Sequence, residues 1–243
     1  MGTRVFAHHT IIPPSILAFL PTELQQSPVY DLAMRLPILA WSVVLALVLA
    51  MDLKEYLQAA DPALPRIVYT VNIAMRLAMT AYLIILAATV LVRTPPIRKA
   101  RGAEPRLSAL FGSFLITALV LFPRRDLSPV AGCMSTVLVL IGDLIATVVL
   151  IQLRGSFSIM AEARQLTTSG AYRLVRHPLY LAEEVATIGV VMQFLSIWTV
   201  MLVIAQIACQ IRRMKNEEVL LMDAFPEYLN YTRQTARIIP GLY

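Results

Sequence analysis

Residues 169–180, SGAYRLVRHPLY, bring together side chains suited to binding an anion. This polar segment lies between two long apolar runs and contains Arg173, Arg176 and His177. Pro178 suits the first turn of a helix, because the N–H that it lacks would have no partner there. The remaining N–H groups of such a turn, with the helix dipole, form a seat for a carboxylate or phosphate. Taken alone, the segment is equally typical of a basic cap at a membrane interface.

A pair of carboxylates follows about forty residues later, where Glu217 and Glu218 end the stretch RRMKNEE. If two antiparallel helices connect the segments, the pair returns to the same face as the His-Pro turn. Tyrosine and phenylalanine side chains lie nearby in the sequence: Tyr172, Tyr180, Phe225, Tyr228 and Tyr231. Carboxylates, an anion seat and aromatic rings beside apolar helices suit a zwitterionic cofactor that carries a nucleoside.

The composition indicates an integral membrane protein. Hydrophobic residues make up 58% of the 243 residues and charged residues 15%, against about 45–50% and about 25% in soluble domains. The basic residues lie at the ends of apolar runs, where anionic lipid headgroups and the positive-inside rule account for them. We therefore expect membrane lipids, and no nucleic acid, as partners.

The apolar runs predict an all-α, polytopic transmembrane bundle of about six helices in one domain. Residues 1–34 form an N-terminal arm, residues 35–153 hold four helices, and residues 154–243 form a cofactor-binding region. The expected spans are 34–51, 67–92, 107–122 and 129–153. The run 179–211 is too long for one span of about 20 residues and too short for two. A turn at 193–196 would make it a tightly paired helical hairpin.

The distribution of lysine and arginine predicts the topology. With a cytoplasmic N-terminus, the inside segments 1–35, 93–106, 154–178 and 212–243 hold 16 of the 21 basic residues. This bias predicts a multi-pass protein with both termini in the cytoplasm. The membrane is a bacterial inner membrane or the endoplasmic reticulum, and the sequence leaves the oligomeric state open.

Ionisable residues also occur inside the expected spans, where a charge costs at least about 2.5–3.5 kcal/mol. Arg76 and Asp143 lie at similar depths, so we expect them to form an ion pair. The alternative is that they are polar elements of a substrate pocket. Glu183 and Glu184 follow the His-Pro turn, and one of them is expected to face the cytoplasmic pocket.

These motifs resemble the isoprenylcysteine carboxyl methyltransferase and phospholipid methyltransferase superfamily. Its signature is Arg-His-Pro-x-Tyr, followed after a helical hairpin by Glu-Glu; here it reads RHPLY at 176–180 and EE at 217–218. The resemblance covers about residues 150–243, from GSFS at 155–158 to RIIPGLY at the end. Ala182 departs from the pattern, because many members have glycine there. Residues 1–105 carry no such signal.

The resemblance implies S-adenosylmethionine as the cofactor, bound on the cytoplasmic side, and a lipophilic methyl acceptor that enters from the bilayer. It implies no metal. The cofactor-binding residues it implies are Tyr172, His177, Pro178, Tyr180, Leu181, Glu217 and Glu218. Arg173, Arg176 and Glu217 are the residues expected to act in catalysis.

Several alternatives remain open at this point. The acceptor can be an isoprenylated cysteine carboxylate, a phospholipid amine or a small thiol. An NADPH-dependent enzyme like the membrane sterol reductases would have a similar C-terminal region, and a non-enzymatic membrane binding protein could share the fold. The RHPLY and EE motifs favour the methyltransferase, and the nine glycines include no GxGxxG turn of a Rossmann domain.

Overall fold

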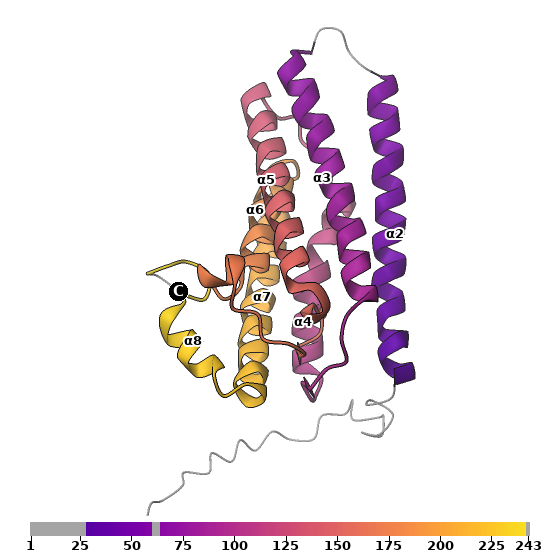
Figure 1. The fold of residues 1–243 in the computed structure, drawn as a ribbon. Helices are drawn as coiled ribbons and strands as arrows, with labels where there is room; N and C mark the ends of the chain where they lie inside the picture. The colour runs from indigo at the N-terminus through magenta and orange to yellow at the C-terminus, as the bar shows by residue number, and fades with distance from the viewer. Residues whose placement is uncertain (1–27, 60–63, 242–243) are drawn as a thin grey trace, which may run out of the picture.

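The computed structural model describes residues 28–59 and 64–241, which form a mostly helical bundle (Figure 1). The long elements are α2 (Pro28–Gln58), α3 (Arg66–Leu91), α5 (Pro129–Leu153) and α7 (Ile197–Ala224). Between them come α4 (Glu104–Phe114), which continues as the 3₁₀ helix η1 (Leu115–Leu121), and α6 (Pro178–Met192). The small elements are β1 (Arg98–Lys99), η2 (Arg154–Ser156), β2 (Glu162–Ala163), η3 (Gly170–Arg173) and α8 (Tyr228–Gln234).

Within the described residues, five helices are long and apolar enough to cross a membrane: 35–58, 66–91, 104–121, 129–156 and 197–224. The predicted sixth helix, α6, has 15 residues. It is therefore about 22 Å long, which is shorter than a hydrocarbon core of about 30 Å, and it is not among the five candidate spans. Residues 28–34, expected in the N-terminal arm, are the first turns of α2, and residues 1–27 of that arm lie outside the described residues.

Local sequence signals define where the helices begin. Ser128 caps α5 by accepting a hydrogen bond from the backbone N–H of Ala131 at 3.3 Å, and Pro129 follows at the first helical position. Ser196 and Thr199 form a reciprocal capping box at the start of α7. Such caps satisfy N–H groups that lack a partner inside the helix. The α5 bounds agree with the predicted span.

Helix α7 is longer than the sequence predicted. We expected the apolar helix to end near residue 211, but α7 continues to Ala224 and carries Glu217 and Glu218 on its last turns. The change from apolar to charged residues at Arg212 marks the end of the hydrophobic surface, and not the end of the helix. Lysine, arginine and glutamate are good helix formers, so the helix continues into the polar region.

Helices α6 and α7 are joined by a turn over residues 193–196, as predicted, but they are not tightly paired. The close partner of α6 is α5, because small residues let the two backbones approach. A Cβ added at Gly142 would lie 2.5 Å from the backbone nitrogen of Ala186, and one at Gly189 would lie 2.7 Å from the Ser135 oxygen. Helix α7 packs on α4, which leaves an apolar groove between α6 and α7.

The predicted pair of Arg76 and Asp143 does not form. Arg76 Nε lies 2.7 Å from Asp52 Oδ2 on α2, and its guanidinium lies over the Tyr56 ring at 4.1 Å. Asp143 instead lies within electrostatic range of Glu183 on α6. Similar depth was therefore insufficient to predict the pair, because Arg76 lies on the face of α3 that packs against α2.

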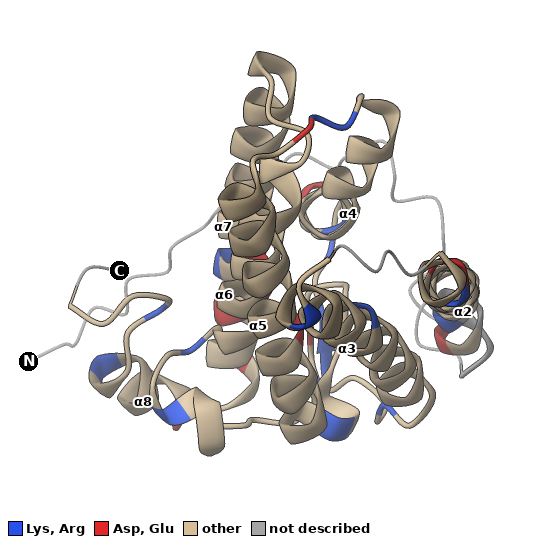
Figure 2. Cartoon of the chain, turned by 90° about the horizontal axis from the view of Figure 1, so that it is seen from above, with Lys and Arg blue, Asp and Glu red and all other residues tan. Residues whose placement is uncertain are grey.

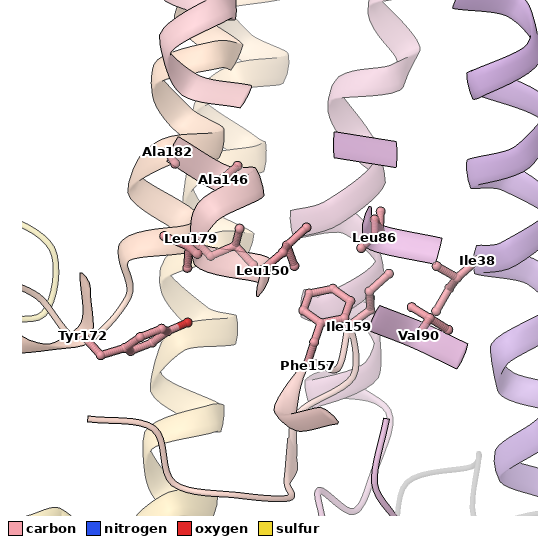
Figure 3. Close-up of a cluster of buried hydrophobic side chains, with 11 residues drawn as sticks. Ile38, Leu86, Val90, Ala146, Leu150, Phe157, Ile159, Tyr172, Leu179 and Ala182 are labelled. Atoms are coloured by element: carbon pink, nitrogen blue, oxygen red, sulfur yellow. The ribbon is translucent and has the colours of Figure 1, made fainter. Parts of the chain in front are cut away.

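A buried apolar cluster lies near the end of the bundle that carries the loops (Figure 3). It runs from Ile38 on α2 through Leu86 and Val90 on α3 to Leu150 on α5. Further members from the following loop and α6 are Phe157, Ile159, Tyr172, Leu179 and Ala182. Ala182 thus fills core space beside Ala146. Helix α2 lies beyond α3, away from α6 and α7 (Figure 2).

The described parts of the four segments predicted to lie inside the cell meet at this end of the bundle. Strand β1 pairs antiparallel with β2, which joins the 93–106 and 154–178 segments. Arg212 Nε lies 2.7 Å from Glu104 Oε1, and Arg93 Nη2 lies 2.9 Å from Asp31 Oδ1. The segments therefore share one face, as the charge bias requires. The cytoplasmic side of that face remains a prediction.

Candidate functional site

The predicted meeting of the His-Pro turn and the Glu-Glu pair occurs in the structure. Arg176 Nε donates to Glu218 Oε1 at 2.8 Å, and His177 Nε2 lies 3.1 Å from the same oxygen. Arg237 adds two hydrogen bonds, from Nε to Oε1 at 3.0 Å and from Nη2 to Oε2 at 2.6 Å. Glu218 is buried, with 3% of its surface exposed. The anion held beside the His-Pro turn is therefore a side chain of the protein itself.

The C-terminal segment holds the His-Pro turn in place through its backbone. The N–H groups of Arg176 and His177 donate to the carbonyl oxygens of Ala236 and Arg237 at 2.8 and 3.0 Å. Arg176 Nη1 also donates to the carbonyl oxygens of Thr232, at 3.1 Å, and Thr235. Most donors of Arg176 thus serve the fold of this segment.

Helix α8 contributes two tyrosines beside the turn. Tyr228 is buried, and the Tyr231 hydroxyl donates to the backbone oxygen of Tyr172. Burial raises the pKa of Tyr231 to about 12, and burial likewise raises the pKa of Tyr172. The Tyr172 and Tyr231 phenols therefore stay protonated at physiological pH and can act as hydrogen-bond donors.

A polar pocket lies between the 154–177 segment, the end of α7 and α8. Of the predicted site residues, it is lined by Tyr172, Arg176, His177, Tyr180 and Glu217. Pro178 and Glu218 are buried next to it but are not lining residues, and Arg173 and Leu181 are exposed outside it. The structure thus gathers five of the predicted residues around one cavity.

Glu217 and Glu218 differ in their surroundings although they are adjacent. Glu217 accepts a hydrogen bond from the Tyr180 hydroxyl, and its Oε1 lies 3.2 Å from Arg213 Nε. Arg213 is 3% exposed and lies over the Tyr180 ring at 4.7 Å. Arg213 also donates to Ser113 Oγ at 2.8 Å and to the backbone oxygen of Ser158 at 3.2 Å. Glu217 is therefore the carboxylate of the pair that faces the pocket.

The pocket includes charged residues that the sequence analysis did not single out. These are Arg164 and Glu162 on the β2 segment and Arg213 on α7. Arg164 Nη2 lies 2.6 Å from Glu162 Oε2 and 3.2 Å from Asp31 Oδ1. A signal was present in the sequence, since Arg213 precedes Glu217 by one helical turn. Nothing in the sequence linked Arg164, just after β2, to Asp31 on α2.

Asp31 is the shared partner of three arginines. Arg35 Nη2 lies 2.7 Å from Asp31 Oδ2, and Arg93 Nη2 and Arg164 Nη2 lie 2.9 and 3.2 Å from Oδ1. Burial disfavours the ionised carboxylate, but the hydrogen bond from Arg35 and the charges of Arg93 and Arg164 outweigh burial. They hold the pKa of Asp31 below its usual value. The start of α2 is thereby fixed to the pocket segment.

An apolar groove of about 400 Å³ lies between α6 and α7. Its walls include Thr187, Ile188, Val191, Val203, Ile207 and Met214. Tyr180 lines both this groove and the polar pocket. Glu184 also borders the groove, and its Oε1 accepts from Gln206 and Gln210 at 2.8 and 3.2 Å. Glu183 accepts a hydrogen bond from the Tyr82 hydroxyl at 2.8 Å. Neither Glu183 nor Glu184 lines the polar pocket, although one of them was expected to face it.

Comparison with known proteins gives two findings. The chain is 34% identical over 79 residues to the cobalt-zinc-cadmium resistance protein CzcN of Cupriavidus metallidurans. The matched region covers 32% of this chain and 36% of that relative, so it spans about a third of each. Residues 135–223 match the sequence model of the isoprenylcysteine carboxyl methyltransferase (ICMT) family. This segment contains the His-Pro turn and both glutamates, and over it the predicted resemblance to the ICMT family is confirmed.

Proposed function

We propose that this membrane protein is a methyltransferase that transfers a methyl group from S-adenosylmethionine to a lipophilic acceptor. The similarity of residues 135–223 to the ICMT family supports the reaction type. The two cavities and the residues that separate them support the proposed donor and acceptor class.

The observation that carries the proposal is the position of Tyr180, which borders both cavities. The pocket on one side has charged walls and suits a polar, zwitterionic donor. The groove on the other side has almost exclusively apolar walls and lies between α6 and the candidate membrane-spanning helix α7, so it suits a lipid chain. A water-soluble donor and a membrane-dissolved acceptor would meet beside Tyr180, where the two cavities adjoin.

The residues of the polar pocket fit the chemistry of the proposed cofactor. Glu217 has a second carboxylate oxygen that can accept from an ammonium or a ribose hydroxyl. Tyr172, Tyr228 and Tyr231 provide aromatic walls for an adenine ring. The pocket has a volume of about 100 Å³, against roughly 300–1,000 Å³ for small-molecule sites. The nucleoside would therefore occupy the open mouth of the pocket as well as its enclosed part.

When bound, S-adenosylmethionine would supply a methyl group activated by its sulfonium charge. The protein then has to align the acceptor and exclude water, and this alignment can lower the barrier by several kcal/mol. Tyr180 would separate donor and acceptor, because it lines both cavities, and the Arg213 guanidinium lies over its ring at 4.7 Å. An anionic acceptor group needs no general base. For an amine acceptor, Glu217 is the group placed to take the proton.

The experiment is a ligand-stabilisation assay followed by methyl transfer. We expect S-adenosylhomocysteine, and not NADPH, to raise the melting temperature of the purified protein in detergent. We then expect label from methyl-labelled S-adenosylmethionine to enter a lipid extract. Stabilisation by NADPH alone would favour a reductase, and stabilisation by neither compound would favour a binding protein.

A matched pair of variants on α7 tests the acceptor groove. Val203 lines the groove, whereas Val200 does not and is 37% exposed. We expect Val203→Trp to fill the groove and reduce methyl transfer to lipid while leaving S-adenosylhomocysteine binding intact. Val200→Trp should leave both unchanged. Equal activity of the two variants would contradict the assignment of the groove.

A further inference from the structure

Arg164 is a buried cation with hydrogen-bonding capacity to spare. It is 2% exposed and lines the polar pocket. Its Nη2 serves both Glu162 and Asp31, but its Nε and Nη1 are buried without a hydrogen-bond partner. A buried donor without a partner is costly, and native proteins rarely leave one in that state without a functional reason. Arg164 therefore has two donor nitrogens, Nε and Nη1, without a protein partner.

The charges around Arg164 also call for an anion. Among the described residues of this cluster, Arg35, Arg93 and Arg164 share two carboxylates, Asp31 and Glu162. The Asp31 carboxylate contacts all three guanidinium groups, so its single negative charge does not fully neutralise that of Arg164. An excess positive charge in a buried site is stabilised when an anion binds there.

The other basic residues that line the pocket have protein partners. Arg176 and His177 contact Glu218, and Arg176 also donates to two backbone oxygens. Arg213 donates to Ser113 and Ser158 through its two Nη atoms, and its Nε, which makes no hydrogen bond, lies 3.2 Å from Glu217 Oε1. Arg164 is thus the pocket cation best placed to take a ligand carboxylate.

We propose that Arg164 binds the carboxylate of the cofactor's amino-acid end, and that Asp31 is the positioning residue that holds Arg164 in place. Glu217, with its second oxygen, would take the ammonium of the same zwitterion. The inference rests on the proposed function and names a binding residue for it. It also assigns a role to α2, because Asp31 lies outside the segment that resembles the ICMT family.

The carboxylate that binds Arg164 is assigned to the cofactor and not to the acceptor because of the cavity that Arg164 lines. Arg164 lines the polar pocket and is not among the residues that line the apolar groove. An acceptor held in the groove would reach Tyr180 first.

The test compares two ligands on the purified full-length protein by calorimetry. S-adenosylhomocysteine carries the carboxylate, and its decarboxylated analogue keeps the ammonium, the thioether and the nucleoside. A charge-assisted hydrogen bond to a carboxylate corresponds to about a tenfold to hundredfold preference. We expect the wild-type protein to prefer S-adenosylhomocysteine by a ratio in this range.

The variants Arg164→Lys and Arg93→Lys separate binding from folding. Both keep the positive charge and lose the guanidinium fork, and both residues contact Asp31, but Arg93 does not line the pocket. We expect the preference ratio to fall about tenfold in Arg164→Lys and to stay unchanged in Arg93→Lys. Asp31→Asn, which keeps Arg164 itself, should lower the ratio to an intermediate value.

Two results with the variants would overturn the inference. One is an unchanged ratio in Arg164→Lys together with normal S-adenosylhomocysteine binding, which would leave the proposed function standing. The other is an equal loss of affinity for both ligands in Arg164→Lys and Arg93→Lys, which would make the cluster purely structural. If the wild-type protein does not bind S-adenosylhomocysteine, the proposed function fails and this inference fails with it.

Discussion

The same substitution at the adjacent residues Glu217 and Glu218 should affect two different properties, ligand binding and fold stability. Glu218→Gln removes the charge that Arg176, His177 and Arg237 share, at a site where the side chain is 4% exposed. Glu217→Gln leaves an oxygen that can still accept from Tyr180. We expect Glu218→Gln to destabilise the fold, and Glu217→Gln to keep the fold and weaken S-adenosylhomocysteine binding.

The magnitude follows from the contacts of Glu218. Two arginines and a histidine contact its carboxylate at 2.6–3.1 Å. Removing one partner of a buried ion pair costs about 3–5 kcal/mol, because the remaining charge stays buried. For a protein of this size, about 1 kcal/mol changes the melting temperature by roughly 2–4 °C. Glu218→Gln should therefore melt roughly 6–20 °C below the wild-type protein.

The assay is thermal unfolding in detergent, followed by helical circular dichroism, combined with calorimetric titration of S-adenosylhomocysteine. Glu217→Gln should melt within a few degrees of wild type, because its site is more exposed, while its affinity falls about tenfold or more. A stable Glu218→Gln variant, or a Glu217→Gln variant with wild-type affinity, would refute the division of roles between the two residues.

The remaining predictions concern packing, pH and the pocket wall. Gly142→Leu should abolish folded yield because α5 and α6 touch there, whereas Gly132→Leu, whose Cβ would lie 4.0 Å from its nearest neighbour, should express normally. Asp31 has a lowered pKa in the folded state, so its stabilising effect is complete above about pH 4 and is lost as the pH falls further. The difference in melting temperature between wild type and Asp31→Asn should accordingly narrow below about pH 4; a constant difference would contradict the lowered pKa. Tyr180→Phe removes the hydrogen bond to Glu217 and should lower methyl transfer more than it lowers the melting temperature.

The sequence predicted the helices well because hydrophobic length and capping residues act locally. The α5 bounds follow from Ser128 and Pro129 at one end and from the end of the apolar run at the other. The end of α7 was predicted wrongly, because helix propensity continues where hydrophobicity stops. The pair of Arg76 and Asp143 was also wrong, since depth along two helices does not determine which faces meet.

The candidate site was predicted in part. Motif residues on either side of the turn at 193–196 were expected to meet, and Arg176 and His177 do contact Glu218. Their roles in cofactor binding remain predictions. The sequence did not predict that two arginines and a histidine would enclose Glu218, because Arg237 reaches it through the folding of the C-terminal segment onto residues 175–177.

The sequence by itself determined that the chain is a helical membrane protein and that two polar motifs lie on one face, because both follow from local hydrophobicity and charge. The tertiary structure alone decided which glutamate faces the pocket, that Asp31 on α2 reaches Arg164, and that a groove lies between α6 and α7. These features depend on contacts between residues far apart in the sequence. Their geometry arises only when α6 packs against α5 and α7 packs against α4.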